Sequence, residues 1–227
     1  MSRFFRHDVI SGIIGFVFLI LVTNLALLVT ALPLVVLLVT TDPARSWPLL
    51  AVAAPLAAPG VAAAFRAFRE HVSGDLGPLR AFARGLRETW RAALVIGVAV
   101  TAVVLILVVD VRVLADSPVS VVTVPVLAVL AVLTLMAGLL SLVAVAEVPH
   151  ARAVDVLRAA LVLGTRRWYL TAASLGALAV QVAVFATAPA IGLGVTASAV
   201  LYFAWTNSRF TLRPVLDLDP VADPATA

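Results

Sequence analysis

Long apolar runs separated by short polar segments extend along most of the chain, from about residue 9 to residue 206. Most of these runs approach the ~20 apolar residues that an α-helix needs to cross a bilayer. They lack the alternation of apolar and polar positions that marks a half-buried strand. The pattern predicts an all-α fold, a polytopic transmembrane helix bundle that begins with an uncleaved first span. Six spans are expected, at about residues 9–39, 49–65, 92–109, 119–146, 168–188 and 190–206.

The first and the last runs depart from the length of one regular span. The first is longer than a span requires and contains Asn24 and Pro33, so a tilted or kinked helix is expected there. The last is the shortest, and Pro189 precedes it; if it does not cross fully, five spans remain. Residues 1–214 are expected to form a single membrane domain, followed at 215–227 by a disordered acidic tail that contains proline.

Arginines are distributed unevenly between the polar segments. All 16 basic residues are arginine. With six spans and the N-terminus in the cytoplasm, only Arg45 and Arg112 fall on the outer side. Positive charge in short loops favours the cytoplasmic side of a membrane. The pattern therefore predicts a multi-pass protein of the inner (cytoplasmic) membrane with both termini in the cytoplasm.

The composition supports lipid as the solvent for much of the chain. Hydrophobic residues make up 63% and charged residues 12%, whereas a soluble domain has about 45–50% and about 25%. The mean hydropathy is +1.14. The net charge of +4 does not indicate a nucleic-acid partner, because the arginines lie at the edges of apolar runs. The absence of cysteine excludes disulfides, iron–sulfur clusters and thiolate zinc sites.

The segment before the third run has the pattern of an amphipathic helix, from Leu79 to Arg91. The apolar face consists of Leu79, Phe82, Leu86 and Trp90, and the arginine face of Arg80, Arg84, Arg87 and Arg91. Such a helix typically lies flat in the headgroup layer, with its arginines on the phosphates of anionic lipids. A docking helix for a cytoplasmic partner is the alternative.

A second basic segment, residues 147–167, precedes the fifth run. It contains Arg158, Arg166 and Arg167. Because this segment also falls on the expected cytoplasmic side, we expect its arginines to contact lipid headgroups or a docked partner.

Few polar side chains interrupt the apolar runs. Asn24 and Gln181 are uncharged amides inside runs, for which interhelical hydrogen bonds worth about 0.6–2 kcal/mol are expected. Glu147 follows the fourth run, with Arg152 available for an ion pair. No acid lies deep in a run, which argues against a proton-coupled pump.

Small residues at four-residue spacing form two ridges, on which helices in lipid can approach closely. The ridges comprise Ala54, Ala58 and Ala62 in the second run and Ala190, Gly194 and Ser198 in the last. Near the end of the last run, Tyr202 and Trp205 are expected to form an interfacial aromatic belt, with a sugar-stacking platform as the alternative.

No arrangement typical of catalysis or metal binding stands out. His7, His71 and His150 lack metal-ligand spacing, and the sequence contains no nucleophile–base pair or phosphate-binding glycine loop. The sequence therefore predicts neither an enzyme nor a bound cofactor.

Four segments occur in a suggestive order between Asn24 and Pro214. They are NLALLVTALP (Asn24 to Pro33), APGVAAAFRAF (Ala58 to Phe68), ETWRAALVIG (Glu88 to Gly97) and the second basic segment. Together they resemble the YesL-like family of bacterial membrane proteins, a domain of unknown function. The stretch between Pro33 and Ala58 is longer than is usual in that family.

The resemblance implies a role in sugar import, because family members are often encoded beside genes of carbohydrate uptake and breakdown. The expected function is that of a non-enzymatic accessory in bacterial carbohydrate uptake. Its expected partners are the lipid bilayer, anionic lipids, and a sugar permease complex or a second copy of the chain. A solute transporter or permease in its own right is one alternative, and a structural or lipid-binding membrane protein is another.

Overall fold

The computed structural model describes residues 2–74, 76–148, 168–187 and 192–216, and every regular element in these ranges is a helix. The elements are α1 (Ser2–Thr30), α2 (Leu32–Thr40), α3 (Pro43–Ser73), α4 (Pro78–Leu114), α5 (Ser120–Glu147), α7 (Trp168–Thr187), the π-helix η1 (Gly192–Thr196) and α9 (Ala197–Leu216). The expected all-α fold is therefore confirmed.

Five helical segments in the described ranges are long and apolar enough to cross a membrane. They are Ile13–Thr30, Arg45–Ser73, Pro78–Leu114, Ser120–Glu147 and Trp168–Phe185. This set fits a multi-pass membrane protein. The sixth expected span corresponds to η1 and α9, which are not in the set, so the count of six is not confirmed.

The long first run is divided into two helices. α1 ends at Thr30, and Ala31 interrupts the helical backbone before α2 begins with Pro33 in its first turn. Proline cannot donate a backbone hydrogen bond within a helix, so it is tolerated best at such a start. The expected kink is thus a break between helices.

The expected interfacial helix is not a separate element, because α4 continues without interruption from Pro78 to Leu114. α3 ends at Ser73, and Gly74 follows it with a positive φ of 78°, which suits a residue without a side chain. Gly77 and Pro78 start α4. The predicted apolar face also differs: Phe82 is buried, whereas Leu79 and Trp90 are exposed. Residues 79–91 are therefore the first part of one long helix.

Small residues determine which face of α4 turns inward. A methyl group on Gly97 would lie 2.7 Å from the Ala58 Cβ and 3.1 Å from the Pro55 carbonyl oxygen. At Gly85, a methyl group would lie 3.3 Å from the Ala63 Cα. The two helices thus approach through backbone and small side chains. The ridge that contains Ala54, Ala58 and Ala62 is used within the chain, with Ala58 and Ala62 buried and Ala54 partly buried.

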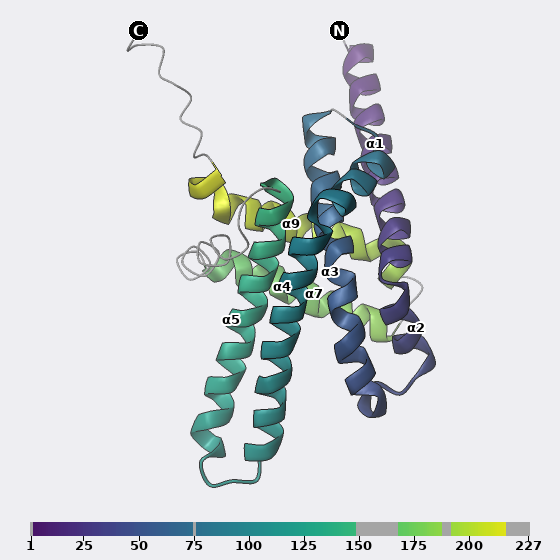
Figure 1. Cartoon of the computed structure of the whole chain (residues 1–227). Coiled ribbons are helices and arrows are strands. Elements are labelled where there is room, and N and C mark those ends of the chain that lie inside the picture. Colours follow the sequence, from purple (N-terminus) through teal and green to yellow (C-terminus); the bar gives the residue numbers. More distant parts are fainter. Residues whose placement is uncertain (1, 75, 149–167, 188–191, 217–227) are drawn as a thin grey trace.

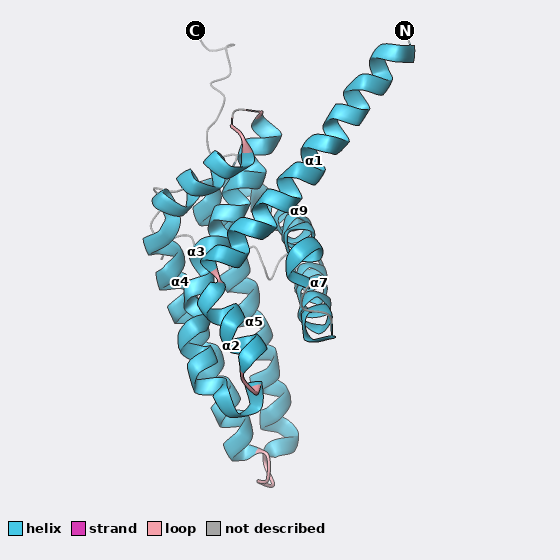
Figure 2. Ribbon diagram, turned by 90° about the vertical axis from the view of Figure 1, so that its right-hand side faces the viewer, coloured by secondary structure: helices cyan, strands magenta, loops and turns pink. Residues whose placement is uncertain are grey.

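The long helices α3, α4 and α5 run side by side, and α4 and α5 project as a hairpin beyond the rest of the molecule (Figure 1). The first turns of α4 run obliquely to the remainder of that helix, as both Figure 1 and Figure 2 show. α1 and α2 pack beside α3.

α7 and α9 run across this bundle rather than along it. In Figure 1 both helices lie at a steep angle to α3, α4 and α5, and in Figure 2 they are seen nearly end-on. α9 packs along α7 and also contacts α1, α3 and α5. The hairpin of α7, η1 and α9 is therefore held to the bundle mainly by α9.

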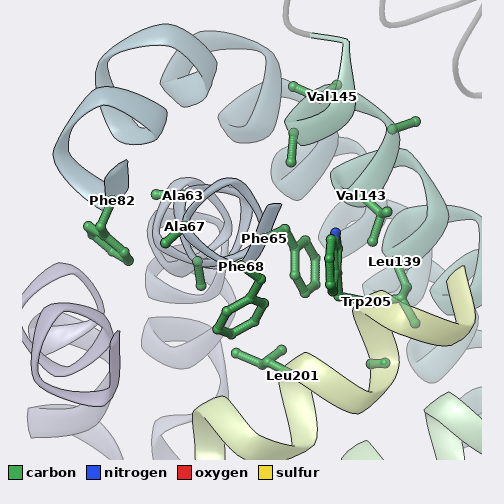
Figure 3. Close-up of a cluster of buried hydrophobic side chains, with 14 of the residues drawn as sticks. Ala63, Phe65, Ala67, Phe68, Phe82, Leu139, Val143, Val145, Leu201 and Trp205 are labelled. Carbon is green, nitrogen blue, oxygen red and sulfur yellow. The ribbon is translucent and has the colours of Figure 1, made fainter. Parts of the chain in front are cut away.

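Aromatic side chains fill the place where α9 crosses α3. Trp205 lies between Phe65 and Phe68 of α3 and the side chains of α5 (Figure 3). Tyr202 makes edge-to-face contacts with Phe68 and with Phe16 of α1, both at 5.2 Å between ring centroids. The expectation of an interfacial belt or a sugar platform at Tyr202 and Trp205 is wrong, because α9 carries these rings into the core.

Candidate functional site

Charged side chains gather at two levels of the bundle. On α3, residues 46–65 carry no charge and extend over about 30 Å, the thickness of the hydrocarbon core of a bilayer. We call the level at Arg66 the arginine-rich end and the level at Arg45 the opposite end. The arginine-rich end holds Arg66, Arg69, Arg80, Arg84, Arg87, Arg91 and Arg209 among the described side chains, and the opposite end holds Arg45 and Arg112.

Arg66 joins α3 to α4 and α5. Its Nε lies 3.1 Å from Glu70 Oε1, and its Nη2 lies 3.5 Å from Glu88 Oε2 on α4. Its Nη1 also donates a hydrogen bond of 3.2 Å to the carbonyl of Ala146 in α5. The Arg66 and Glu70 side chains are nearly buried, so each offsets the desolvation of the other.

Glu147 is the second centre of charge, at the end of α5. Its carboxylate is only 7% exposed and lies within 3.8 Å of Arg69 Nε and 3.6 Å of Arg209 Nε. Trp205 Nε1 donates a hydrogen bond of 3.0 Å to Oε1, and Arg69 Nη1 donates to the Glu147 carbonyl. This one residue therefore ties α3, α5 and α9 together. The expected partner Arg152 lies outside the described residues.

These contacts balance the buried charge at the arginine-rich end. Three arginines and three glutamates take part, namely Arg66, Arg69, Arg209, Glu70, Glu88 and Glu147. Because opposite charges in a low-dielectric interior attract strongly only when well paired, the network holds its helices in one arrangement.

The arginine face predicted from sequence lies on the outside of the same end. Arg80, Arg84, Arg87 and Arg91 are exposed, and in the described part of the chain none of them has a carboxylate within ion-pair distance. Arg91 lies over the ring of Trp90, with 5.2 Å from Cζ to the ring centroid. We call these four residues the arginine stripe.

Asn24 connects α1 to the irregular start of the last helix. Its Nδ2 donates to the carbonyl of Gly194 at 3.0 Å, and its Oδ1 accepts from the backbone N–H of Ser198 at 2.8 Å. Ser198 Oγ in turn donates to the carbonyl of Ile20 at 2.8 Å. A π-helix leaves backbone groups out of the regular α-helical ladder, and the amide side chain of Asn24 satisfies two such groups.

Gln181 performs a related task on α7. Its Nε2 donates to the carbonyl of Gly192 at 2.6 Å, so both amides contact η1. Its Oε1 is buried and has no hydrogen-bond partner among the described residues. Asn24 makes the expected interhelical hydrogen bond. Gln181 bonds instead to η1, the element that follows its own helix in the chain.

Some of the remaining residues with a predicted role are described by the structure, and others lie outside its described ranges. Gly194 is exposed, and among the described residues no atom lies within 4 Å of a methyl group placed on it. Its expected role in close packing stays a prediction, and the contact that the structure gives it is through its carbonyl. Ser198 is buried against α1. Arg158, Arg166, Arg167 and Ala190 lie outside the described residues.

Only one ion pair of the charge network could be predicted from the sequence. Arg66 and Glu70 stand four residues apart, a spacing that favours an ion pair on one helix face. The contact of Arg69 and Arg209 with Glu147 joins three separate helices, and no spacing rule predicts it. The one sequence feature that pointed to this contact was the position of Glu147 at the end of an apolar run.

The described residues offer little for chemistry on a substrate. Among them, no group of three or more His, Asp or Glu side chains is placed to hold a metal ion. Two shallow hollows on the α4–α5 hairpin are lined by apolar side chains and Arg112. The arrangement is therefore suited to holding helices and presenting charge.

Comparison of the chain with protein-family models, with curated proteins and with solved structures gives no match. The resemblance to the YesL-like family thus stays a prediction. The structural conclusion is that the described residues form an all-helical fold, with five helices long and apolar enough to span a membrane, which is consistent with a multi-pass membrane protein.

Proposed function

We propose that the protein is a non-enzymatic accessory of a bacterial uptake system, embedded in the inner membrane with both termini in the cytoplasm. In this proposal the arginine-rich end faces the cytoplasm, because positive charge favours that side. The start of α1 and the end of α9 lie toward this end, which supports an even number of crossings (Figure 1). A count of six stays a prediction that requires both α7 and η1–α9 to cross.

The observation that supports the accessory role is that backbone carbonyls of η1 accept hydrogen bonds from side chains of the chain itself. Transporters expose unwound backbone near the membrane midplane, where carbonyls bind ions or substrate. Here the carbonyls of Gly192 and Gly194 already accept hydrogen bonds from Gln181 and Asn24. The irregular element therefore supports a structural connection better than a transport site.

The carbohydrate part of the proposal rests on the family resemblance. An ATP-driven sugar permease is the partner that this resemblance implies, and the second basic segment is its proposed contact, through Arg158, Arg166 and Arg167. The charge network supports this division of roles, since Arg66, Arg69 and Arg209 at the arginine-rich end are already paired with glutamates within the chain.

Reconstitution separates an accessory from a transporter. The purified full chain, alone in liposomes, is expected to give no saturable uptake of radiolabelled mono- or oligosaccharides, while co-purification from native membranes is expected to retain a sugar permease. Saturable uptake that depends on the protein would reject the accessory role in favour of a transporter.

The contact is tested with matched variants. Replacing Arg166 and Arg167 by alanine is expected to abolish the co-purification. The control replaces Arg45 and Arg112 at the opposite end, which removes the same charge without touching the proposed contact. Equal loss in both variants, or retention in both, would reject the second basic segment as the contact.

A further inference from the structure

We propose that the arginine stripe on the first part of α4 is a binding site for the headgroups of anionic phospholipids in the leaflet at the arginine-rich end. The site consists of Arg80, Arg84, Arg87 and Arg91, with Trp90 beside them. It requires the membrane-embedded bundle, but it does not depend on a permease partner.

The first reason is the charge that remains after pairing. Arg66, Arg69 and Arg209 are matched by Glu70, Glu88 and Glu147. Glu88 follows directly after Arg87 in the chain, but its carboxylate turns to Arg66 at 3.5 Å. Among the described residues of the arginine-rich end, the stripe is thus the surface whose arginines have no carboxylate partner. A bound anion would balance their charge.

The second reason is that the stripe faces away from the protein. At 3.6 residues per turn, the four arginines fall within about 60° of one another around the helix. The residues buried against the rest of the chain lie on the other side of the same turns, for example Ala81, Gly85 and Thr89. The arginines are therefore available to whatever surrounds the helix, and in a membrane protein that surrounding is lipid.

The third reason is the direction of the helix. Eleven residues separate the first and last arginine, a distance of about 16 Å along the axis, whereas one headgroup layer is only about 5–8 Å thick. An upright helix would place the stripe partly in the hydrocarbon core or in water. Because the first turns of α4 run obliquely (Figures 1 and 2), the stripe extends along the layer instead.

The fourth reason is the tryptophan at the membrane side of the stripe. Trp90 is 45% exposed and Arg91 lies over its ring. Exposed tryptophan is typical of the membrane interface, where its ring contacts lipid and its N–H remains in a polar layer. The chain then carries no charged residue from Ala92 to Val109, which places the hydrocarbon boundary directly after Arg91.

The test measures lipid binding to the purified full chain in neutral detergent. Dioctanoyl phosphatidylglycerol is titrated into the protein, and binding is followed by microscale thermophoresis, with dioctanoyl phosphatidylcholine as the uncharged-headgroup comparison. We expect phosphatidylglycerol to bind more tightly, and its affinity to fall as salt rises. Replacing Arg84 and Arg87 by glutamine is expected to weaken its binding about 25-fold, since each arginine contributes about five-fold.

The control variant replaces Arg45 and Arg112 by glutamine, which removes two exposed arginines at the opposite end and is expected to leave binding unchanged. A second stripe variant, Arg80→Gln with Arg91→Gln, repeats the test if the first fails to fold. Equal affinity for the two lipids, or equal effects of stripe and control variants, would overturn the proposal. Tighter binding of a polyglutamate peptide than of phosphatidylglycerol would also overturn it and assign the stripe to an acidic protein.

Discussion

At the scale of single residues, Asn24 and Glu147 fix α9 at its start and at its middle. Asn24 bonds to Gly194 and Ser198 at the start of the helix, and Glu147 holds Trp205 and Arg209 in its middle turns. Each acts where a backbone group or a charge would otherwise be buried without a partner. Because such groups are expensive to leave unpaired in a low-dielectric medium, both positions are expected to be sensitive to substitution.

Replacing Asn24 by alanine is expected to lower the free energy of unfolding by about 1–3 kcal/mol. The variant leaves the Gly194 carbonyl and the Ser198 N–H without their partner. Reversible unfolding of the purified protein in mixed micelles with rising SDS measures the change. Thr134→Ala is the control, because that hydroxyl bonds only to the Leu130 carbonyl of its own helix. A similar effect of both changes would contradict the role given to Asn24.

Replacing Glu147 by glutamine is expected to cost about 1–3 kcal/mol in the same assay. The amide can still accept from Trp205, but Arg69 and Arg209 lose their counter-charge. The cost stays below that of a fully buried pair because both arginines are partly exposed to solvent or headgroups.

A double variant checks that charge is the cause of the Glu147 effect. Adding Arg209→Gln to Glu147→Gln is expected to recover part of the lost stability, because one unpaired charge is removed. Asp116→Asn, in the exposed connection between α4 and α5, is the control and is expected to be neutral. Additive losses in the double variant would rule out the ion pair as the source of stability.

At the scale of elements, the contact between α3 and α4 depends on the absence of side chains. A methyl group on Gly97 would approach both the side chain of Ala58 and the backbone of Pro55, so one of the helices would have to shift. Gly97→Ala is therefore expected to destabilise the protein by about 1–3 kcal/mol.

Gly176 in α7 provides the matched control for Gly97. Within the described part of the chain, no atom of another segment lies within 4 Å of a methyl group placed there. Gly176→Ala is therefore expected to be neutral or to stabilise by up to about 1 kcal/mol through helix propensity. SDS unfolding of the two variants measures the difference. Equal stability would show that the contact between α3 and α4 tolerates a larger separation.

At the scale of the whole molecule, the hairpin of α7, η1 and α9 decides the topology. Thr30 of α1 lies against Gly60 of α3. Asn24, which binds η1, precedes Thr30 in α1 and therefore lies closer to the arginine-rich end. Gly60 is itself nearer to Arg66 than to Arg45 in the chain. The π-helix η1 therefore lies in the half of the bundle nearer the arginine-rich end.

Single cysteines test this arrangement cleanly, because the chain contains none of its own. In spheroplasts treated with a membrane-impermeant maleimide, Asp116→Cys is expected to be labelled from outside, and Ser73→Cys only after permeabilisation. Thr187→Cys, at the far end of α7, separates two span counts: the predicted six spans require labelling from outside, whereas the position of η1 in the structure favours resistance to it. Labelling of Thr187 from outside would instead support six spans, and a reversed pattern at Asp116 and Ser73 would reject the orientation.

The sequence predicted the structure well wherever an apolar environment alone determines that a segment forms a helix. Apolar runs of membrane length predicted helices, and the limits of α5 and α7 differ from the predicted runs by only a residue or two. The sequence was less informative where helices meet. Trp205 has the composition of an interfacial belt residue, yet it is buried because α9 crosses α3 at Phe68.

By itself, the sequence determined the helical class, the presence of helices long and apolar enough to span a membrane, and the uneven distribution of arginine between the two ends. These follow from backbone groups that must be satisfied within each segment in lipid and from local charge. Only the tertiary structure decided that Glu147 pairs with Arg69 and Arg209, that Asn24 supports η1, and that four arginines of α4 have no carboxylate partner in the described part of the chain. Those outcomes depend on which helix faces meet, and most of the membrane-length helices have several apolar faces that could meet.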